Sequence, residues 1–414
     1  MKRLFILFAV FGIAGCSSFG KGMMEAILDK GEEKDTRQCE IRGGNIPGID
    51  SYFAKGNTVK VMMIHGVGTH EPGYSTRIQE NLAKDLNLTV FSKRFKDITL
   101  LNPDDGETVI GNLRVSRMQN EDKTKNLLFF ELTWSDITTP QKNILAYDYS
   151  GQYDYKRAAF NNTTKRFIND TVPDPMIYLI DRNGLILNSA KQATCWMLSS
   201  KWENLDYRQK KVCRVSSFNQ IRDLNRENIV YITHSLGSRI LIDSVSDIVN
   251  EVGREDLSRN KEARLIIDEM RTKNMTVYML ANQLPMLQIG RKKPTVHNQY
   301  DSYCTPKGKK HGERVFNRVN VVAFNDPNDL LSYDITQEFV DEYIDSRMCP
   351  AVTNVNINVA KEISAFGVGV VNPITAHTEY DNDERIIEMI SHGTKDIKNN
   401  PALATRCSFI RLED

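Results

Sequence analysis

The strongest constraint on the fold comes from residues 229–250. Residues 229–233 (IVYIT) form a short apolar, β-prone run that ends at the turn His234-Ser235-Leu236-Gly237. Residues 238–250 (SRILIDSVSDIVN) follow with the apolar spacing of an amphipathic helix. The segment therefore predicts a strand, a tight turn and a helix in direct succession.

The same order recurs earlier in the chain and extends the prediction to a whole fold. Residues 58–64 are β-prone and end at the turn His65-Gly66-Val67-Gly68, after which residues 74–86 show helical spacing. Further strands are predicted at residues 127–133, 276–281, 319–324 and 354–359. Strands that alternate with helices predict an α/β fold whose mostly parallel sheet is covered on both faces. Residues 136–226 interrupt this alternation and are predicted to form an inserted cap or helical subdomain.

The N-terminus has the features of an export signal. Lys2 and Arg3 precede an apolar run at residues 4–13, which is too short to span a bilayer as a stable helix. Residues 13–16 (IAGC) resemble a bacterial lipobox, which implies that Cys16 is lipidated and begins the mature chain. An ordinary signal peptide followed by a chance cysteine is the alternative. Ser17, by resemblance to lipoprotein sorting, favours the outer membrane.

These observations divide the chain into three predicted parts and indicate which kinds of molecule it binds. Residues 1–15 are expected to be a lipoprotein signal peptide, residues 16–56 a polar lipid-anchored tether, and residues 57–414 the folded domain. The net charge of +1 gives no overall field that would favour nucleic acid. A membrane, through the lipid anchor, is therefore a predicted partner, and nucleic acid is not.

The cysteines other than Cys16 suggest disulfide bonds. They number six, and an exported chain meets an oxidising compartment, so up to three disulfides are expected, with their pairing left open. Free buried cysteines are the alternative. The chain contains no Cys-x-x-Cys pair, which argues against a structural zinc site.

The turn at residues 233–237 resembles the nucleophile elbow of the α/β-hydrolase superfamily. In that family a sharp strand-to-helix turn presents a serine, here Ser235, as the nucleophile. The usual motif is Gly-x-Ser-x-Gly, and Thr233 replaces its first glycine in this chain. The resemblance covers residues 58 to about 392 and implies a lipase- or esterase-like serine hydrolase with an inserted cap.

The resemblance also assigns the remaining site residues. The oxyanion would be bound by the backbone N–H groups of Val67, in the glycine-rich turn, and Leu236, just after the nucleophile. The base would be His377, which follows the last predicted strand. His392 is the other late histidine, but it has the position of a residue that ends a helix.

The acid is expected in the turn after the strand at residues 319–324, where two aspartates compete. Asp329 is preferred because it precedes Leu330-Leu331, as in many members of the family. Asp326 precedes a proline and has the position of a residue that caps its own turn. The order Ser235, Asp329, His377 is the order of the α/β-hydrolases.

His234 is predicted to be a packing or shaping residue, and neither a cofactor nor a metal is expected. His234 neighbours the nucleophile but should point elsewhere, because adjacent residues in a sharp turn diverge. His65 and His70 lack both the spacing of two ligands on one helix face and an accompanying carboxylate cluster, which argues against a metal.

The predicted activity is hydrolysis of carboxylic esters through an acyl-enzyme at the cell envelope. Lipids or phospholipids are the favoured substrates, because a tethered enzyme would work at a membrane. Two alternatives stay open: an acyltransferase with the same three residues, and a non-catalytic lipoprotein that keeps the fold for binding.

Overall fold

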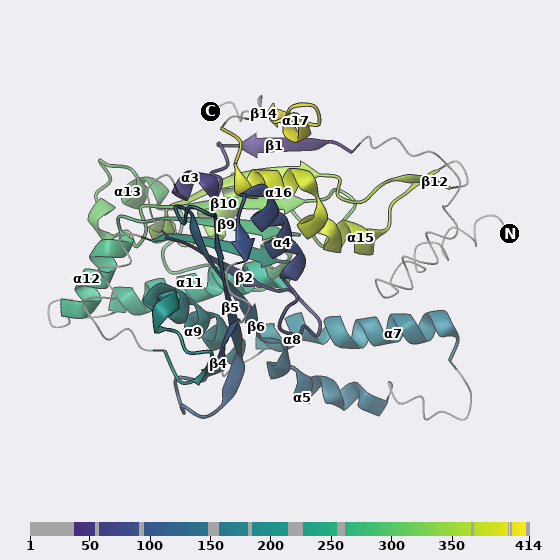
Figure 1. Ribbon diagram of the computed structural model, residues 1–414, viewed down its shortest axis with the longest axis horizontal. Coiled ribbons are helices and arrows are strands. Elements are labelled where there is room, and N and C mark those ends of the chain that lie inside the picture. The colour runs from purple at the N-terminus through teal and green to yellow at the C-terminus, as the bar shows by residue number, and fades with distance from the viewer. Residues whose placement is uncertain are drawn as a thin grey trace.

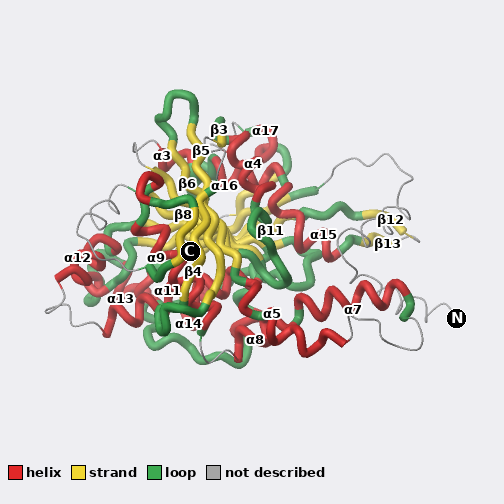
Figure 2. Tube along the Cα trace, turned by 60° about the horizontal axis from the view of Figure 1, so that its bottom comes forward, coloured by secondary structure: helices red, strands yellow, loops and turns green. Residues whose placement is uncertain are grey.

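The computed structural model describes residues 37–53, 58–90, 95–147, 157–180, 184–213, 227–254, 261–365, 368–395, 397 and 400–410. Its centre is a 12-stranded sheet, with helices on both faces (Figures 1 and 2). The strands are β1 (Cys39–Gly43), β2 (Thr58–Ile64), β3 (Thr89–Val90), β4 (Lys96–Leu101), β5 (Val109–Gln119), β6 (Asn126–Thr133), β7 (Arg208–Lys210), β8 (Asn228–His234), β9 (Asn274–Leu280), β10 (Arg318–Asn325), β11 (Pro350–Ile357) and β14 (Cys407–Ile410). A separate hairpin contains β12 (Ile363–Ala365) and β13 (Val368–Val370).

The strands lie in the order β14-β1-β11-β10-β9-β8-β2-β6-β5-β4-β7, with β3 paired to β5. The central strands from β6 through β2, β8, β9 and β10 to β11 run parallel, whereas β5 pairs with β6 and β1 pairs with β11 in the antiparallel sense. The predicted α/β fold with a mostly parallel sheet is therefore confirmed.

The main helices are α4 (Thr76–Asp85), α9 (Leu185–Ser199), α11 (Leu236–Arg254), α12 (Lys261–Met270) and α16 (Glu384–Ser391). Shorter ones are α3 (Asp50–Phe53), α5 (Thr139–Lys142), α13 (Tyr300–Cys304), α14 (Gln337–Tyr343), α15 (Pro373–Thr378) and α17 (Pro401–Ala404). Helices α7 (Ala159–Thr171) and α8 (Pro173–Ile180) follow α5 in the chain.

Apolar side chains on alternate residues of the central strands fill two cores, one on each face of the sheet. On β2, Met62 and Ile64 belong to one core and Val61 and Met63 to the other. Helices α9 and α11 contribute to the first core, and α4 and α16 contribute to the second. Burial on both faces explains why the central strands are almost uniformly apolar.

Two boundaries differ from the sequence-based expectation. The predicted tether ran to residue 56, but residues 39–43 form β1, which lies inside the sheet between β11 and β14. The predicted insertion at residues 136–226 is also not one unit. Helix α9 packs beside α11 against the sheet and β7 pairs with β4, whereas α7 extends away from the sheet (Figures 1 and 2).

The six cysteines expected to pair form three disulfides, namely Cys39–Cys407, Cys195–Cys213 and Cys304–Cys349. The first joins β1 to β14 at the edge of the sheet. Within the described ranges, no helix is both long and apolar enough to cross a bilayer.

Candidate active site

Ser235 occupies the sharp turn between β8 and α11. Its φ of 53° lies in the left-handed region, which is rare for a residue with a side chain and marks local backbone strain. Its amide donates to the carbonyl of Leu280 on β9, at 2.9 Å, which ties the turn to the neighbouring strand. The turn thus places the serine at the carboxyl ends of the parallel strands.

Two glycines are required by the crowding around this turn. A Cβ on Gly66 would lie 2.7 Å from the Cβ of Ser235, and a Cβ on Gly237 would lie 2.4 Å from the carbonyl oxygen of Ile64. Both distances are too short for real atoms, so neither position accepts a side chain without movement. Thr233, which replaces the first glycine of the usual motif, is fully buried on β8.

His377, on α15, lies directly against the serine. Its Nε2 atom is 3.1 Å from the Ser235 Oγ, and its Nδ1 atom is 2.8 Å and 3.0 Å from the two carboxylate oxygens of Asp329. The side chain of Asn372 caps α15 by accepting from the amide of Ile374 at 3.0 Å, and so fixes the start of the helix that carries His377. The structure therefore brings the three predicted residues into one hydrogen-bonded chain.

Asp329 follows β10 and is held in an ionised state. Burial alone would raise the pKa of its carboxyl group, but the hydrogen bond from His377, the charge of that ring and the amide of Leu331 outweigh burial and lower the pKa. The hydroxyl of Tyr380 also donates to Oδ2, at 3.3 Å. Tyr380 was not foreseen in the sequence, where its only indication is its position three residues after His377.

Asp326, the alternative acid, has a structural role in this arrangement. Its Oδ2 accepts from the amides of Val359 and Ala360, at 2.7 Å and 3.1 Å, and its Oδ1 accepts from the amide of Asn328 at 2.7 Å. These bonds tie the turn after β10 to the segment after β11. Asp329, and not Asp326, is the carboxylate that contacts His377.

His234 contacts the backbone of His377 and not the serine. Its Nε2 atom donates to the carbonyl oxygen of His377, at 2.8 Å. Burial, together with the neighbouring His377, lowers the pKa of His234 to about 3, so the ring is neutral at physiological pH. This geometry agrees with the shaping role expected for His234. It also identifies the group that His234 holds, the main-chain carbonyl of His377, which the sequence did not show.

The turn after β2 is fixed by aromatic packing. The ring of His65 lies between those of His70 and Trp134, with centroid distances of 4.1 Å and 4.7 Å. Its Nε2 atom accepts from the amide of Trp134 at 3.1 Å, and burial lowers its pKa well below the usual value. His65 is thus neutral and fixes the turn through its ring contacts.

The two predicted oxyanion donors belong to the two turns that meet at the serine. Val67 follows Gly66, which touches Ser235, and Leu236 is the first residue of α11. Amides in the first turn of a helix have no acceptor within that helix, so they are available to a ligand. The next amide of the turn, that of Gly68, is already used: it donates to Asp174 of α8 at 2.6 Å.

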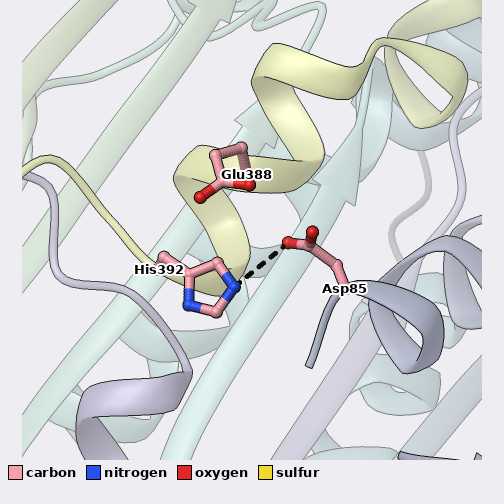
Figure 3. A group of neighbouring side chains, drawn as sticks. All are labelled: Asp85, Glu388 and His392. Carbon is pink, nitrogen blue, oxygen red and sulfur yellow. Dashed lines mark ion pairs between the residues drawn. The ribbon is translucent and has the colours of Figure 1, made fainter. Parts of the chain in front are cut away.

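A second group of ionisable side chains lies between α4 and α16, away from the serine. Asp85, Glu388 and His392 place ligand atoms within 4.8 Å of one another, and the Nε2 atom of His392 is 3.5 Å from Asp85 Oδ2 (Figure 3). Burial and the Asp85 carboxylate raise the pKa of Glu388. Of the described residues, these three are the ones spaced to hold a metal ion. His392, the alternative base, belongs to this group and not to the Ser235 site.

Comparison of the chain with models of protein families, with curated proteins and with solved structures gives no match. A function for this chain must therefore be argued from the site itself.

Proposed function

We propose that this chain is a serine hydrolase of the α/β-hydrolase fold that cleaves carboxylic esters through an acyl-enzyme on Ser235. One observation carries the proposal. The hydroxyl of Ser235, the imidazole of His377 and the carboxylate of Asp329 form a continuous hydrogen-bonded chain. A nucleophile, a base within reach of its proton and a third group that orients the base are the arrangement that acyl transfer needs.

Each residue then has a chemical step. Neutral His377 accepts the proton of Ser235 at Nε2 as the hydroxyl attacks the ester carbonyl, and a bond forms between Oγ and the carbonyl carbon. Asp329, ionised and bonded to Nδ1, keeps the proton on that nitrogen and stabilises the imidazolium. His377 next protonates the departing alcohol. Water, deprotonated by the same ring, then attacks the acyl carbon. The bond between that carbon and Oγ breaks, His377 returns the proton to Oγ, and the acid leaves.

The negative charge on the carbonyl oxygen needs donors that are already in place. The amides of Val67 and Leu236 are the proposed pair, on the positions described above. Loss of one such donor typically lowers kcat by a factor of roughly 100 to 1,000. Because both donors belong to the backbone, their positions depend on the two turns that meet at Gly66 and Ser235.

The position of the site in the fold supports the assignment. Ser235 follows the central strand β8 and Asp329 follows β10, two strands away, and both lie past the carboxyl ends of parallel strands. Ligands bind at that edge in open α/β sheets. The positive φ of Ser235 and its order before Asp329 and His377 agree with a nucleophile elbow.

We also propose a place for the enzyme at the bacterial cell envelope. The lipobox-like residues 13–16 would attach a lipid to Cys16, and three disulfides suit an oxidising compartment. Lipid or phospholipid esters are the favoured substrates for an enzyme held at a membrane.

Labelling with a fluorophosphonate tests the activity directly, because such probes react with activated serines. We expect the wild-type chain and a Ser244→Ala control to be labelled and Ser235→Ala to be unlabelled; Ser244 is a buried serine of α11 that bonds Ile240. Ser235→Ala should also lower turnover of p-nitrophenyl esters by a factor on the order of 10⁴ or more. Equal labelling of Ser235→Ala and wild type would refute the proposal. Absence of any labelling would favour a binding protein, and acylated alcohol products would indicate a transferase.

A further inference from the structure

Helices α7 and α8 carry a stripe of apolar side chains that face solvent. Ile168, Val172, Met176 and Leu179 are 41%, 48%, 58% and 48% exposed, and they follow one another at intervals of four, four and three residues. Val172 is the single residue between α7 and α8, and its φ of −66° and ψ of −34° are helical, so the helical repeat continues across it. The spacing therefore places the four residues along one side of the arm. We call these four residues the apolar stripe, and α7 with α8 the arm.

The opposite side of the arm is attached to the body of the protein. Three residues of this side, Asp170, Asp174 and Tyr178, follow one another at intervals of four. Each lies two residues after a member of the stripe, and two residues correspond to a rotation of about 200° around a helix. Asp174 is fully buried, pairs with Lys142 at 2.8 Å and accepts from the amide of Gly68. The hydroxyl of Tyr178 donates to Asp243 of α11 at 2.6 Å. The arm is therefore held by its polar side, so the apolar stripe is not needed to pack it onto the fold.

The basic and acidic side chains of the arm also lie in different surroundings. The described arm segment, residues 157–180, has three basic residues (Arg157, Lys165 and Arg166), of which Lys165 and Arg166 are exposed. Its two acidic residues, Asp170 and Asp174, are engaged with Thr69, Gly68 and Lys142 on the body side. Lys165 lies three residues before Ile168 and so on the side of the stripe, whereas Arg166 lies four residues before Asp170 and so on the attached side. The side of the arm that carries the stripe is therefore apolar with one exposed basic residue. That combination suits the boundary between the headgroups and the acyl chains of an anionic bilayer.

We propose that the apolar stripe docks the protein onto the surface of a bilayer that contains anionic phospholipids. The stripe enters the interface, and Lys165 beside it faces the lipid phosphates. This proposal rests on the proposed envelope location for its biological setting, but the docking surface itself is argued from the arm.

The N-terminal end of the folded part is compatible with this orientation. Strand β1 begins on the side of the molecule toward which α7 projects (Figure 1). Only 21 peptide links separate Cys16 from Arg37, and a chain of that length reaches at most roughly 75 Å. A lipid on Cys16 would thus keep the arm within reach of the same membrane.

Docking would also act close to the candidate site. Asp170 accepts from the amide and the hydroxyl of Thr69, at 3.0 Å and 2.7 Å, and Asp174 binds Gly68, so the arm holds the turn that contains Val67. A bilayer against the stripe therefore contacts the same helices that position the proposed oxyanion donor.

Vesicle flotation tests the docking surface without the lipid anchor. The protein is the mature polypeptide from residue 16 with Cys16→Ser, which keeps every described element. The vesicles are phosphatidylethanolamine with phosphatidylglycerol, or phosphatidylcholine alone. The test variant is Val172→Ser/Met176→Ser/Leu179→Ser. The matched control is Leu265→Ser/Ile289→Ser, which removes two exposed apolar side chains outside the arm.

We expect wild type and the control to float with the anionic vesicles and the triple variant to partition about 1,000-fold less, because each of the three removed side chains contributes roughly a factor of ten. Lys165→Gln, a second variant that leaves the stripe intact, should weaken binding to anionic vesicles and not to phosphatidylcholine.

Three outcomes would overturn docking: wild type that does not float, a triple variant that floats as well as wild type, or a wild-type dimer that the triple variant converts to a monomer without any vesicle binding. The last would assign the stripe to a second copy of the chain.

The hydrolase proposal can be tested separately, because Ser235→Ala should float like wild type. A chain that floats but is never labelled by the fluorophosphonate would refute the hydrolase and leave the docking surface standing.

Discussion

His234 holds His377 by its backbone: the Nε2 atom of His234 donates to the carbonyl oxygen of His377 at 2.8 Å. The residue next to the nucleophile in sequence thus contacts the proposed base at its main chain, while the imidazole of His377 is left to bridge Ser235 and Asp329. The rings of the two histidines lie 5.1 Å apart in an edge-to-face arrangement. His234 is a positioning residue in this geometry, since its hydrogen bond goes to the main chain of His377 and not to Ser235 Oγ or to the imidazole of His377.

This contact predicts a graded response to substitution. His234→Leu removes the donor and leaves the buried carbonyl of His377 unpaired, so we expect kcat on p-nitrophenyl esters to fall on the order of tenfold to 100-fold, with KM little changed. His234→Gln, which retains an N–H donor, should recover most of that loss. Steady-state kinetics of both variants measure the difference. If His234→Gln were as impaired as His234→Leu, the hydrogen bond would not be what positions His377.

The two aspartates after β10 should respond differently to the loss of charge. Asp329→Asn should lower kcat by a factor of roughly 10⁴, because the amide no longer fixes the tautomer or stabilises the imidazolium of His377. Asp326→Asn should chiefly lower the melting temperature, because Asp326 ties β10 to the segment after β11 through two amides. Kinetics and thermal unfolding of both variants separate the two effects. The opposite ranking in kcat would reassign the acid to Asp326.

Gly66 offers a test of how tightly the two turns meet. Gly66→Ala should reduce turnover strongly, because the added Cβ would lie 2.7 Å from the Cβ of Ser235 and 3.0 Å from the carbonyl oxygen of His234. Gly312→Ala is the matched control, since a Cβ there meets nothing within 4 Å and its φ is not positive. We expect kcat of Gly66→Ala to fall by at least about 100-fold, since a 1 Å displacement at a reacting group has that effect. An active Gly66→Ala chain would show that the turn relaxes freely.

The sequence allowed the local parts of this site to be predicted, because they depend on short-range patterns. The strand–turn–helix around Ser235, the turn at Gly66 and the strand before Asp329 all appear where the apolar spacing indicated them. The choice between Asp329 and Asp326 could not be made with certainty from spacing, since both follow the same strand. Asp329 binds His377 and Asp326 binds the amide of Val359 because their side chains point in different directions, which the sequence does not show.

What the sequence did not show depends on contacts between distant segments. Strand β1 pairs with residues more than 300 positions away, so its short polar sequence gave no local sign of a buried strand. Strands β4 and β5 were also missed, although they pair with each other across the short loop at residues 102–108. The attachment of Gly68 to Asp174 spans 106 residues, and no pattern at either residue indicates the other.

The buried histidine beside the nucleophile predicts a specific dependence of stability on pH. His234 has a pKa of about 3 in the folded chain, whereas an exposed histidine in the unfolded chain has a pKa of about 6.5. Between these values the unfolded state binds a proton that the folded state does not, so the free energy of unfolding must fall as the pH is lowered from about 6.5 toward 3. A single proton limits this slope to about 1.4 kcal/mol per pH unit.

His234→Gln keeps a donor for His377 but has no proton to gain, so its stability should decline less steeply over the same range. His65, whose pKa is also lowered, is present in both chains and contributes to both slopes. Chemical denaturation of wild type and His234→Gln at intervals from about pH 4 to pH 8 measures the difference, with the two curves expected to run parallel above about pH 7 and to separate in slope below it. Parallel curves throughout would mean that His234 takes up its proton in the folded protein as readily as in the unfolded chain, and that the contact with His377 tolerates a charged ring.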